Sequence, residues 1–167
     1  MTDTLRSICE QCTHLNQPQL EFISAQLTRH REIILRDLKE LVSAATAGID
    51  KTVVILGGSI LEAVLYSFLQ SQETYIAQRR GGFTFNPEHS LQNFVNVFNC
   101  WFLDILPNAE IPEFVVQYRD LVHINAELAF PPDICARASR DMLKILNRLL
   151  GELAQFGSPQ AWGTKKN

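Results

Sequence analysis

The sequence of 167 residues lacks several features that would assign it to a familiar class. Its four cysteines are too few and too scattered to form a disulfide framework. The first residues contain no continuous apolar core like that of a cleavable signal, so we expect a cytoplasmic protein. The net charge of −3 gives no global attraction to nucleic acid or to an anionic membrane. Any affinity for such partners must therefore be local.

Metal and phosphate-loop motifs are also incomplete. Cys9, Cys12 and His14 have the spacing of half a zinc site, but no second ligand pair follows. We favour the alternative, in which both cysteines pack on the inner face of a short helix. The glycines at 81 and 82 follow no strand and lack the lysine and hydroxyl of a phosphate-binding loop. We therefore expect no metal and no cofactor.

The sequence contains no convincing alternation of apolar and polar residues that would predict a strand. Helical periodicity instead predicts an all-α, single-domain bundle of five or six helices. Residues 1–17 are expected to form an N-terminal helical segment, residues 18–156 the bundle, and residues 157–167 a flexible C-terminal tail. Expected helices lie near 19–47, 51–78, 88–105, 112–126 and 132–156.

The stretch from Lys51 to Gln70 is apolar in nearly every helical direction. A helix of this kind is buried by its neighbours. Its length also reaches the lower limit for a membrane span, but Glu62 near its centre favours a core helix and no membrane. Ser59, Glu62 and Tyr66 form a narrow polar line on one face. Because a buried carboxylate needs a partner, Glu62 is expected to contact Arg119 or Tyr118.

Helix ends are marked by residues with known positional preferences. Gly48 is expected to end the first long helix and Asp50 to cap the central one. Asn86, Pro87 and Glu88 together resemble the start of a third helix. His30 falls within the apolar stripe of the first long helix, where a histidine is more often a satisfied core or boundary residue than a ligand.

Arg119 and His123 are four residues apart, so they share one helical face, with Asp120 beside them and Glu127 one turn further on. An arginine fork binds phosphate oxygens, and a histidine moves protons near neutral pH. Together they could support phosphoryl-transfer chemistry without a metal. From spacing alone, an ordinary surface pair with a nearby acid is the favoured interpretation.

The run YRDLVH, followed by NAEL and FPPD, resembles the signature region of the HEPN (higher eukaryotes and prokaryotes nucleotide-binding) helical families. GGSILEAVL resembles the small-residue, acid-containing central helix of such proteins, and the likeness spans roughly residues 19–155. The resemblance implies an all-α homodimer that acts as a metal-independent endoribonuclease of a prokaryotic toxin or defence system. It maps the catalytic residues onto Arg119, Asp120 and His123, with supporting roles for Glu62, Tyr118 and Glu127.

The resemblance has one departure. Only three residues separate Arg119 from His123, whereas the family motif usually has four to six, and Val116 stands where similar runs carry another arginine. A second interpretation is therefore a catalytically inactive helical module that works through dimerisation and contacts with a partner. On either interpretation, an antitoxin or a defence-system protein is the expected partner.

The last helix carries a line of positive charges spaced so that they share one face. Such a line can follow a phosphate backbone, although single-stranded binders usually add stacking aromatic side chains. Such aromatics are absent here, so an ordinary solvated helix face is the favoured interpretation and an RNA path the second. We treat these four residues as candidate RNA-binding residues: Arg137, Arg140, Lys144 and Arg148.

Overall fold

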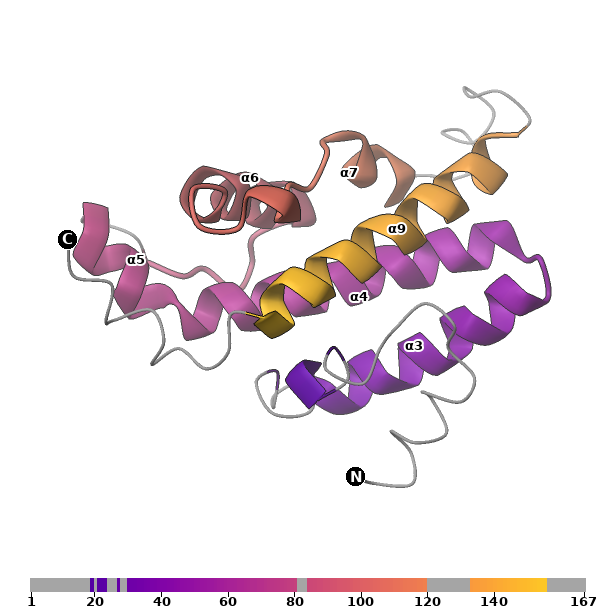
Figure 1. Cartoon of the computed structure of the whole chain (residues 1–167), viewed down its shortest axis with the longest axis horizontal. Coiled ribbons are helices and arrows are strands. Elements are labelled where there is room, and N and C mark those ends of the chain that lie inside the picture. The colour runs from indigo at the N-terminus through magenta and orange to yellow at the C-terminus, as the bar shows by residue number, and fades with distance from the viewer. Residues whose placement is uncertain are drawn as a thin grey trace.

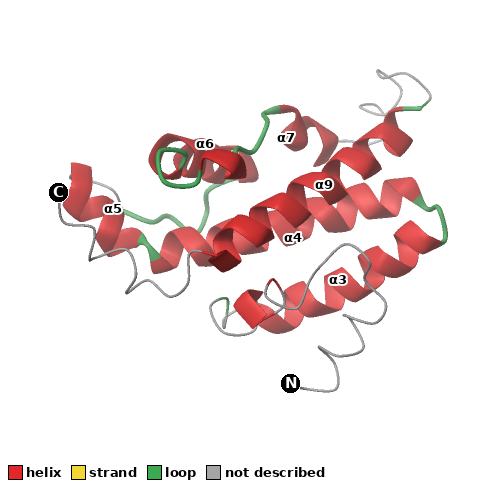
Figure 2. Cartoon of the chain, in the orientation of Figure 1, coloured by secondary structure: helices red, strands yellow, loops and turns green. Residues whose placement is uncertain are grey.

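The computed structural model describes residues 19, 21–23, 27, 30–80, 84–119 and 133–155. Every regular element in these ranges is a helix, and none of these residues lies in a strand (Figure 2). The predicted all-α bundle is therefore confirmed. The segments 1–17 and 157–167 lie outside the described residues.

Helices α3 (Arg31–Thr46) and α4 (Asp50–Ser71) form an antiparallel hairpin (Figure 1). Gly48 in the connecting turn has a φ of +68°, a conformation that glycine adopts without steric cost. The backbone N–H of Ile49 donates to the carbonyl of Ala44 and closes the turn. Gly48 thus follows the first long helix as predicted, whereas α4 is capped by Ile49 and Asp50 is its first residue.

Helix α4 is the centre of the bundle. It contacts α3 on one side and α9 (Ile134–Gln155) on another, while α6 (Leu91–Phe102) and α7 (Phe114–Arg119) cover a third side (Figure 1). Helix α4 is long and apolar enough to cross a membrane, but 61% of its most apolar window is buried inside the protein. The prediction of a buried core helix is confirmed.

Gly57 allows α9 to approach α4 closely. A β-carbon placed on Gly57 would lie 2.2 Å from Cγ of Met142, which is itself fully buried. A side chain on Gly57 would therefore force Met142 or the α9 backbone to move. Gly58, one residue later, faces α7 instead, where a β-carbon would make ordinary contacts of 3.5–3.6 Å with Arg119.

Two segments that were each predicted to form one long helix, 19–47 and 51–78, are interrupted in the structure. The first is not continuous over 19–47, because Leu27 is outside any helix and α3 begins only after a turn at His30. The second ends at Ser71, where the side-chain hydroxyl donates to the carbonyl of Phe68 at 2.7 Å. Gln72 separates it from α5 (Glu73–Arg80).

The start of α6 was also predicted wrongly. Asn86 does not cap this helix, because its side chain accepts a hydrogen bond from the N–H of Glu88 within a turn. Ser90 is the actual cap, and its hydroxyl accepts from the N–H of Asn93 at 3.4 Å. A short 3-10 helix, η1 (Pro107–Ala109), then leads into the extended connection before α7.

Candidate functional site

Arg119 is the last described residue of α7, and its side chain lies across α4. Its stem passes over Gly58, and its Nη2 atom is 2.9 Å from Oε2 of Glu62. The predicted contact between Glu62 and Arg119 is therefore confirmed. The two side chains keep 45% and 30% of their exposure, so the guanidinium is held at one end and remains open to solvent.

The expected reason for the pairing was wrong in one respect. Glu62 lies on a buried helix but not on a buried face, because it belongs to a solvent-facing stripe of α4 with Ile55 and Ser59. A partly exposed pair avoids most of the desolvation cost of a buried one. The contact with Arg119 therefore orients the guanidinium more than it stabilises the fold.

A second arginine borders the same stripe. Arg36 Nε and Nη2 donate to Oδ1 of Asp37 at 2.8 and 2.7 Å, and Ser59 donates to the other carboxylate oxygen at 3.1 Å. The hydrogen bonding of Arg36 to Asp37, and the negative charge of Asp37, raise the pKa of Arg36. Sequence periodicity had placed Ser59 on the polar line, but it gave no signal that Asp37 would be its partner.

Tyr118 faces α9 and does not contact Glu62. Its hydroxyl donates to Oδ2 of Asp141 at 3.2 Å. Burial is the main cause that raises the pKa of Tyr118, and the hydrogen bond to Asp141 adds to it, while the charge of Arg137 opposes it. Tyr118 therefore fastens α7 to α9 beside the first residue of the cationic line.

The other residues of the predicted catalytic motif, Asp120, His123 and Glu127, lie outside the described residues. The pairing of Arg119 with His123 stays a prediction. His30, in contrast, is described: its Nδ1 atom is 2.7 Å from the hydroxyl of Ser67, and its ring meets Tyr66 edge-on. It is a satisfied boundary histidine, as predicted.

The cationic line on α9 is exposed along its whole length. Arg137, Arg140, Lys144 and Arg148 all face solvent, while the opposite side of α9 packs into the core. Arg148 Nη2 donates to the backbone carbonyl of Glu110 at 2.5 Å, which ties the end of the line to the segment after η1. The line therefore fits a path for a polyanion, and it fits a solvated face equally well.

No family model, curated protein or solved structure matches this chain. These comparisons identify no family, so the HEPN resemblance stays a prediction. Among the described residues, no three His, Cys, Asp or Glu side chains gather in a group that could hold a metal ion. Cys100 is an exposed free thiol, and Cys9 and Cys12 lie outside the described residues.

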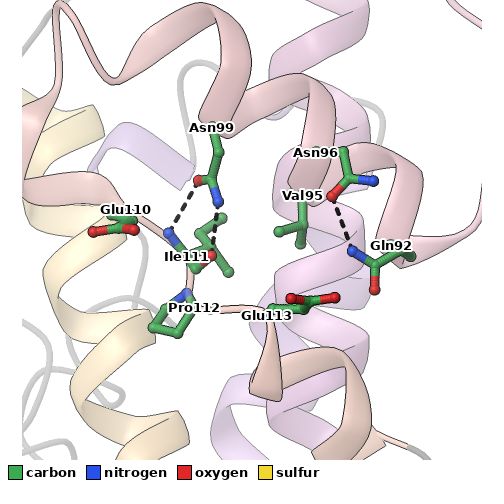
Figure 3. A pocket seen from close by; sticks show the side chains of 8 residues that line it. All are labelled: Gln92, Val95, Asn96, Asn99, Glu110, Ile111, Pro112 and Glu113. Carbon is green, nitrogen blue, oxygen red and sulfur yellow. Dashed lines mark hydrogen bonds between the residues drawn. The ribbon is translucent and has the colours of Figure 1, made fainter.

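One feature of the surface had no signal in the sequence. A hollow of about 540 Å³ lies between α6 and the connection that leads into α7 (Figure 3). Asn99 fixes one wall, because its Nδ2 donates to the carbonyl of Ile111 at 2.8 Å and its Oδ1 accepts from the N–H of Ile111 at 3.1 Å. From the sequence alone, an asparagine at this position of a helix is expected to face solvent, because nothing in the sequence shows that the segment around Ile111 packs beside it.

Proposed function

We propose that this chain is a HEPN-like protein that binds single-stranded RNA and cleaves it without a metal. The observation that carries the proposal is the position of Arg119, whose guanidinium is oriented by Glu62 at 2.9 Å while the arginine side chain remains 45% exposed. A planar cation fixed at one end and open at the other is suited to bind the oxygens of a phosphate group. The exposed cationic line on α9 supplies a second, sequence-independent contact to an RNA backbone.

In the proposed reaction the 2′-hydroxyl of the substrate attacks the adjacent phosphorus. The 2′-hydroxyl gives up its proton, the bond to the 5′-oxygen breaks and that oxygen gains a proton, leaving a 2′,3′-cyclic phosphate and a free 5′-hydroxyl. His123 carries out one of these two proton transfers, as base or as acid, and water carries out the other. Arg119 stabilises the charge that builds on the phosphoryl oxygens, and Asp120 orients one of these two groups. The nucleophile belongs to the substrate, so the protein supplies only proton transfer and positive charge.

The biological setting follows from the same resemblance. We propose a cytoplasmic homodimer whose two copies of α7 lie close together, because isologous dimers are the commonest assemblies and the resembled family dimerises. The protein would act as a toxin or as part of a defence system, and an antitoxin or defence-system protein would hold it in check. Light scattering at micromolar concentration tests the dimer, and a monomer at that concentration would contradict it.

A second candidate function is a catalytically inactive module that works through dimerisation and partner binding. The ion pair itself favours it, since Glu62 neutralises part of the charge that Arg119 would offer a phosphate. The short spacing between Arg119 and His123, and Val116 in place of an earlier arginine, favour it too.

Cleavage of a mixed-sequence, 5′-labelled single-stranded RNA in the presence of EDTA separates the two candidates. The wild-type protein should cleave, and His123→Ala should lose about 10²–10⁴-fold in rate, because positioned proton transfer is worth about that much. His89→Ala is the matched control, since it removes a histidine from a turn outside the site and should cleave like wild type. Intact RNA with all three proteins would favour the inactive module.

A further inference from the structure

The hollow between α6 and the connection into α7 is lined by a mixed set of side chains. It is open to solvent on one side and has a volume of about 540 Å³. Val95 and Ile111, both buried in the core, lie beneath the hollow as its floor, and Pro112 lies beside them (Figure 3). The complete lining comprises Gln92, Val95, Asn96, Asn99, Glu110, Ile111, Pro112 and Glu113.

The polar groups around this floor offer both donors and acceptors. Gln92 Nε2 donates to Oδ1 of Asn96 at 2.9 Å, which leaves Oε1 of Gln92 and Nδ2 of Asn96 for a ligand. The carboxylate of Glu113 lies on the same side as these two amides (Figure 3). Asn99 is engaged with the backbone of Ile111 on both of its polar atoms, so it holds the wall in place.

The cationic line of α9 leads to the rim of this hollow. Arg148, its last member, donates to the backbone carbonyl of Glu110, a lining residue. Arg137 and Arg148 are eleven residues apart, so the line runs for about 16 Å along the helix. A strand of RNA that follows the line would therefore reach the hollow with its phosphates on Arg148.

We propose that the hollow is a base-recognition site that takes a guanine of the bound single-stranded RNA. The proposal rests on the RNA-binding part of the proposed function and deepens it. Guanine presents two adjacent donors, N1–H and the 2-amino group, and the two oxygens of Glu113 match this pair. Adenine, cytosine and uracil do not present this pair of donors, so the carboxylate selects against them.

A basic side chain of a protein partner is the other group that an amide-and-carboxylate pocket could take. Arg148 at the rim disfavours it, because a cationic peptide would approach against the positive charges of α9. The ring of Pro112 suits the flat face of a base, which unstacked nucleotides expose. The combination therefore favours RNA over a basic peptide.

The test measures fluorescence anisotropy with four nine-nucleotide RNAs at low salt: all uridine, and the same RNA with a central guanosine, inosine or adenosine. Wild-type protein should bind the guanosine RNA roughly 5- to 150-fold more tightly than the all-uridine RNA, as a good bidentate contact discriminates. Inosine, which lacks the 2-amino group, should fall between the two, and adenosine should bind like uridine.

Glu113→Gln should bind the guanosine RNA and the all-uridine RNA with equal affinity. Its affinity for the all-uridine RNA should be at least that of the wild-type protein. Glu40→Gln, the same charge change at an exposed position on α3, should leave the preference intact. Far-UV circular dichroism checks that both variants fold. Equal affinity of wild type for all four RNAs would overturn the guanine site while leaving RNA binding standing.

Two further outcomes separate this proposal from the proposed function. No binding of any RNA at low salt would overturn both. Binding of a lysine- and arginine-containing peptide that is lost in Glu113→Gln, without a preference for the guanosine RNA, would overturn the base site and assign the hollow to a protein partner.

Discussion

Glu62 on α4 and Arg119, the last described residue of α7, form an ion pair, with Oε2 and Nη2 2.9 Å apart, on the solvent-facing side of the central helix. Both side chains remain partly exposed, so the attraction is weakened by water. The pair therefore sets where the guanidinium points, and most of the stability of the bundle comes from the apolar faces of α4 and its neighbours.

The first prediction concerns this pair. A double-mutant cycle with Glu62→Gln and Arg119→Met should give a coupling free energy of about 0.2–1 kcal/mol in urea unfolding, as for other exposed pairs. The coupling should shrink further when salt is added. A coupling of about 3 kcal/mol or more, typical of a buried pair that loses one partner, would contradict this account.

The second prediction uses two adjacent glycines with opposite surroundings. Gly57→Ala should lower the free energy of unfolding by about 1–3 kcal/mol, because the new methyl would meet Met142 in the closed contact between α4 and α9. Gly58→Ala is the matched control and should be neutral or stabilising by up to about 1 kcal/mol, because its space is adequate and alanine favours the helix. Urea unfolding with equal losses in both variants would argue against the close approach at Gly57.

The third prediction is a pH effect at Tyr118. Its pKa is raised above the ordinary value of 10.0, first by burial and then by the hydrogen bond to Asp141, so the folded state holds this proton more tightly. The stability that this provides is complete below pH 10 and is lost as the pH rises through the higher folded pKa. The free energy of unfolding of wild type should therefore fall more steeply above pH 10 than that of Tyr118→Phe. Parallel curves for the two proteins would show that ionisation of Tyr118 has no part in this loss.

Sequence reasoning succeeded where burial alone decides the pattern. Most apolar residues of α4 are buried, with Ile55 an exposed exception, and Ile23, Leu27 and Ile34 of the preceding apolar stripe are buried as well. It failed on backbone continuity, since that stripe continues across the break before α3 and periodicity cannot distinguish a bent path from a straight helix. Local signals at Asn86 and Ser90 compete for the same helix start, and only tertiary packing decides between them.

In the candidate site, too, some contacts were predicted from the sequence and others were not. The contact between Glu62 and Arg119 was predicted correctly, although the reason for it was not, because the Glu62 side chain stays 30% exposed and does not need a partner for burial. The links from Ser59 to Asp37 and from Asn99 to Ile111 were not, because they join segments whose relative position depends on the packed bundle. Helical spacing reports which residues share a face, but it does not report what faces them.

The fourth prediction tests the cationic line. Binding of an all-uridine RNA should weaken with salt, and the slope of log K against log[salt] should decrease by roughly 0.7 for each phosphate contact removed. Arg140→Gln with Lys144→Gln should show this smaller slope and a lower affinity at low salt. Lys39→Gln on α3 is the control for a lost exposed charge and should change neither. A slope that stays the same in the α9 double variant would remove the line from the RNA path.

The central claim is that Arg119 acts on a phosphate whose neighbouring 2′-hydroxyl is the nucleophile. The most direct measurement is the chemical form of the product ends, determined by mass spectrometry after digestion of a single-stranded RNA in EDTA. This account predicts 2′,3′-cyclic phosphate and 5′-hydroxyl ends from wild type, about 10²-fold or more slower formation by Arg119→Ala, and no cleavage when the 2′-hydroxyls are replaced by 2′-O-methyl groups. Intact RNA, 5′-phosphate ends, or an Arg119→Ala protein as active as wild type would contradict it.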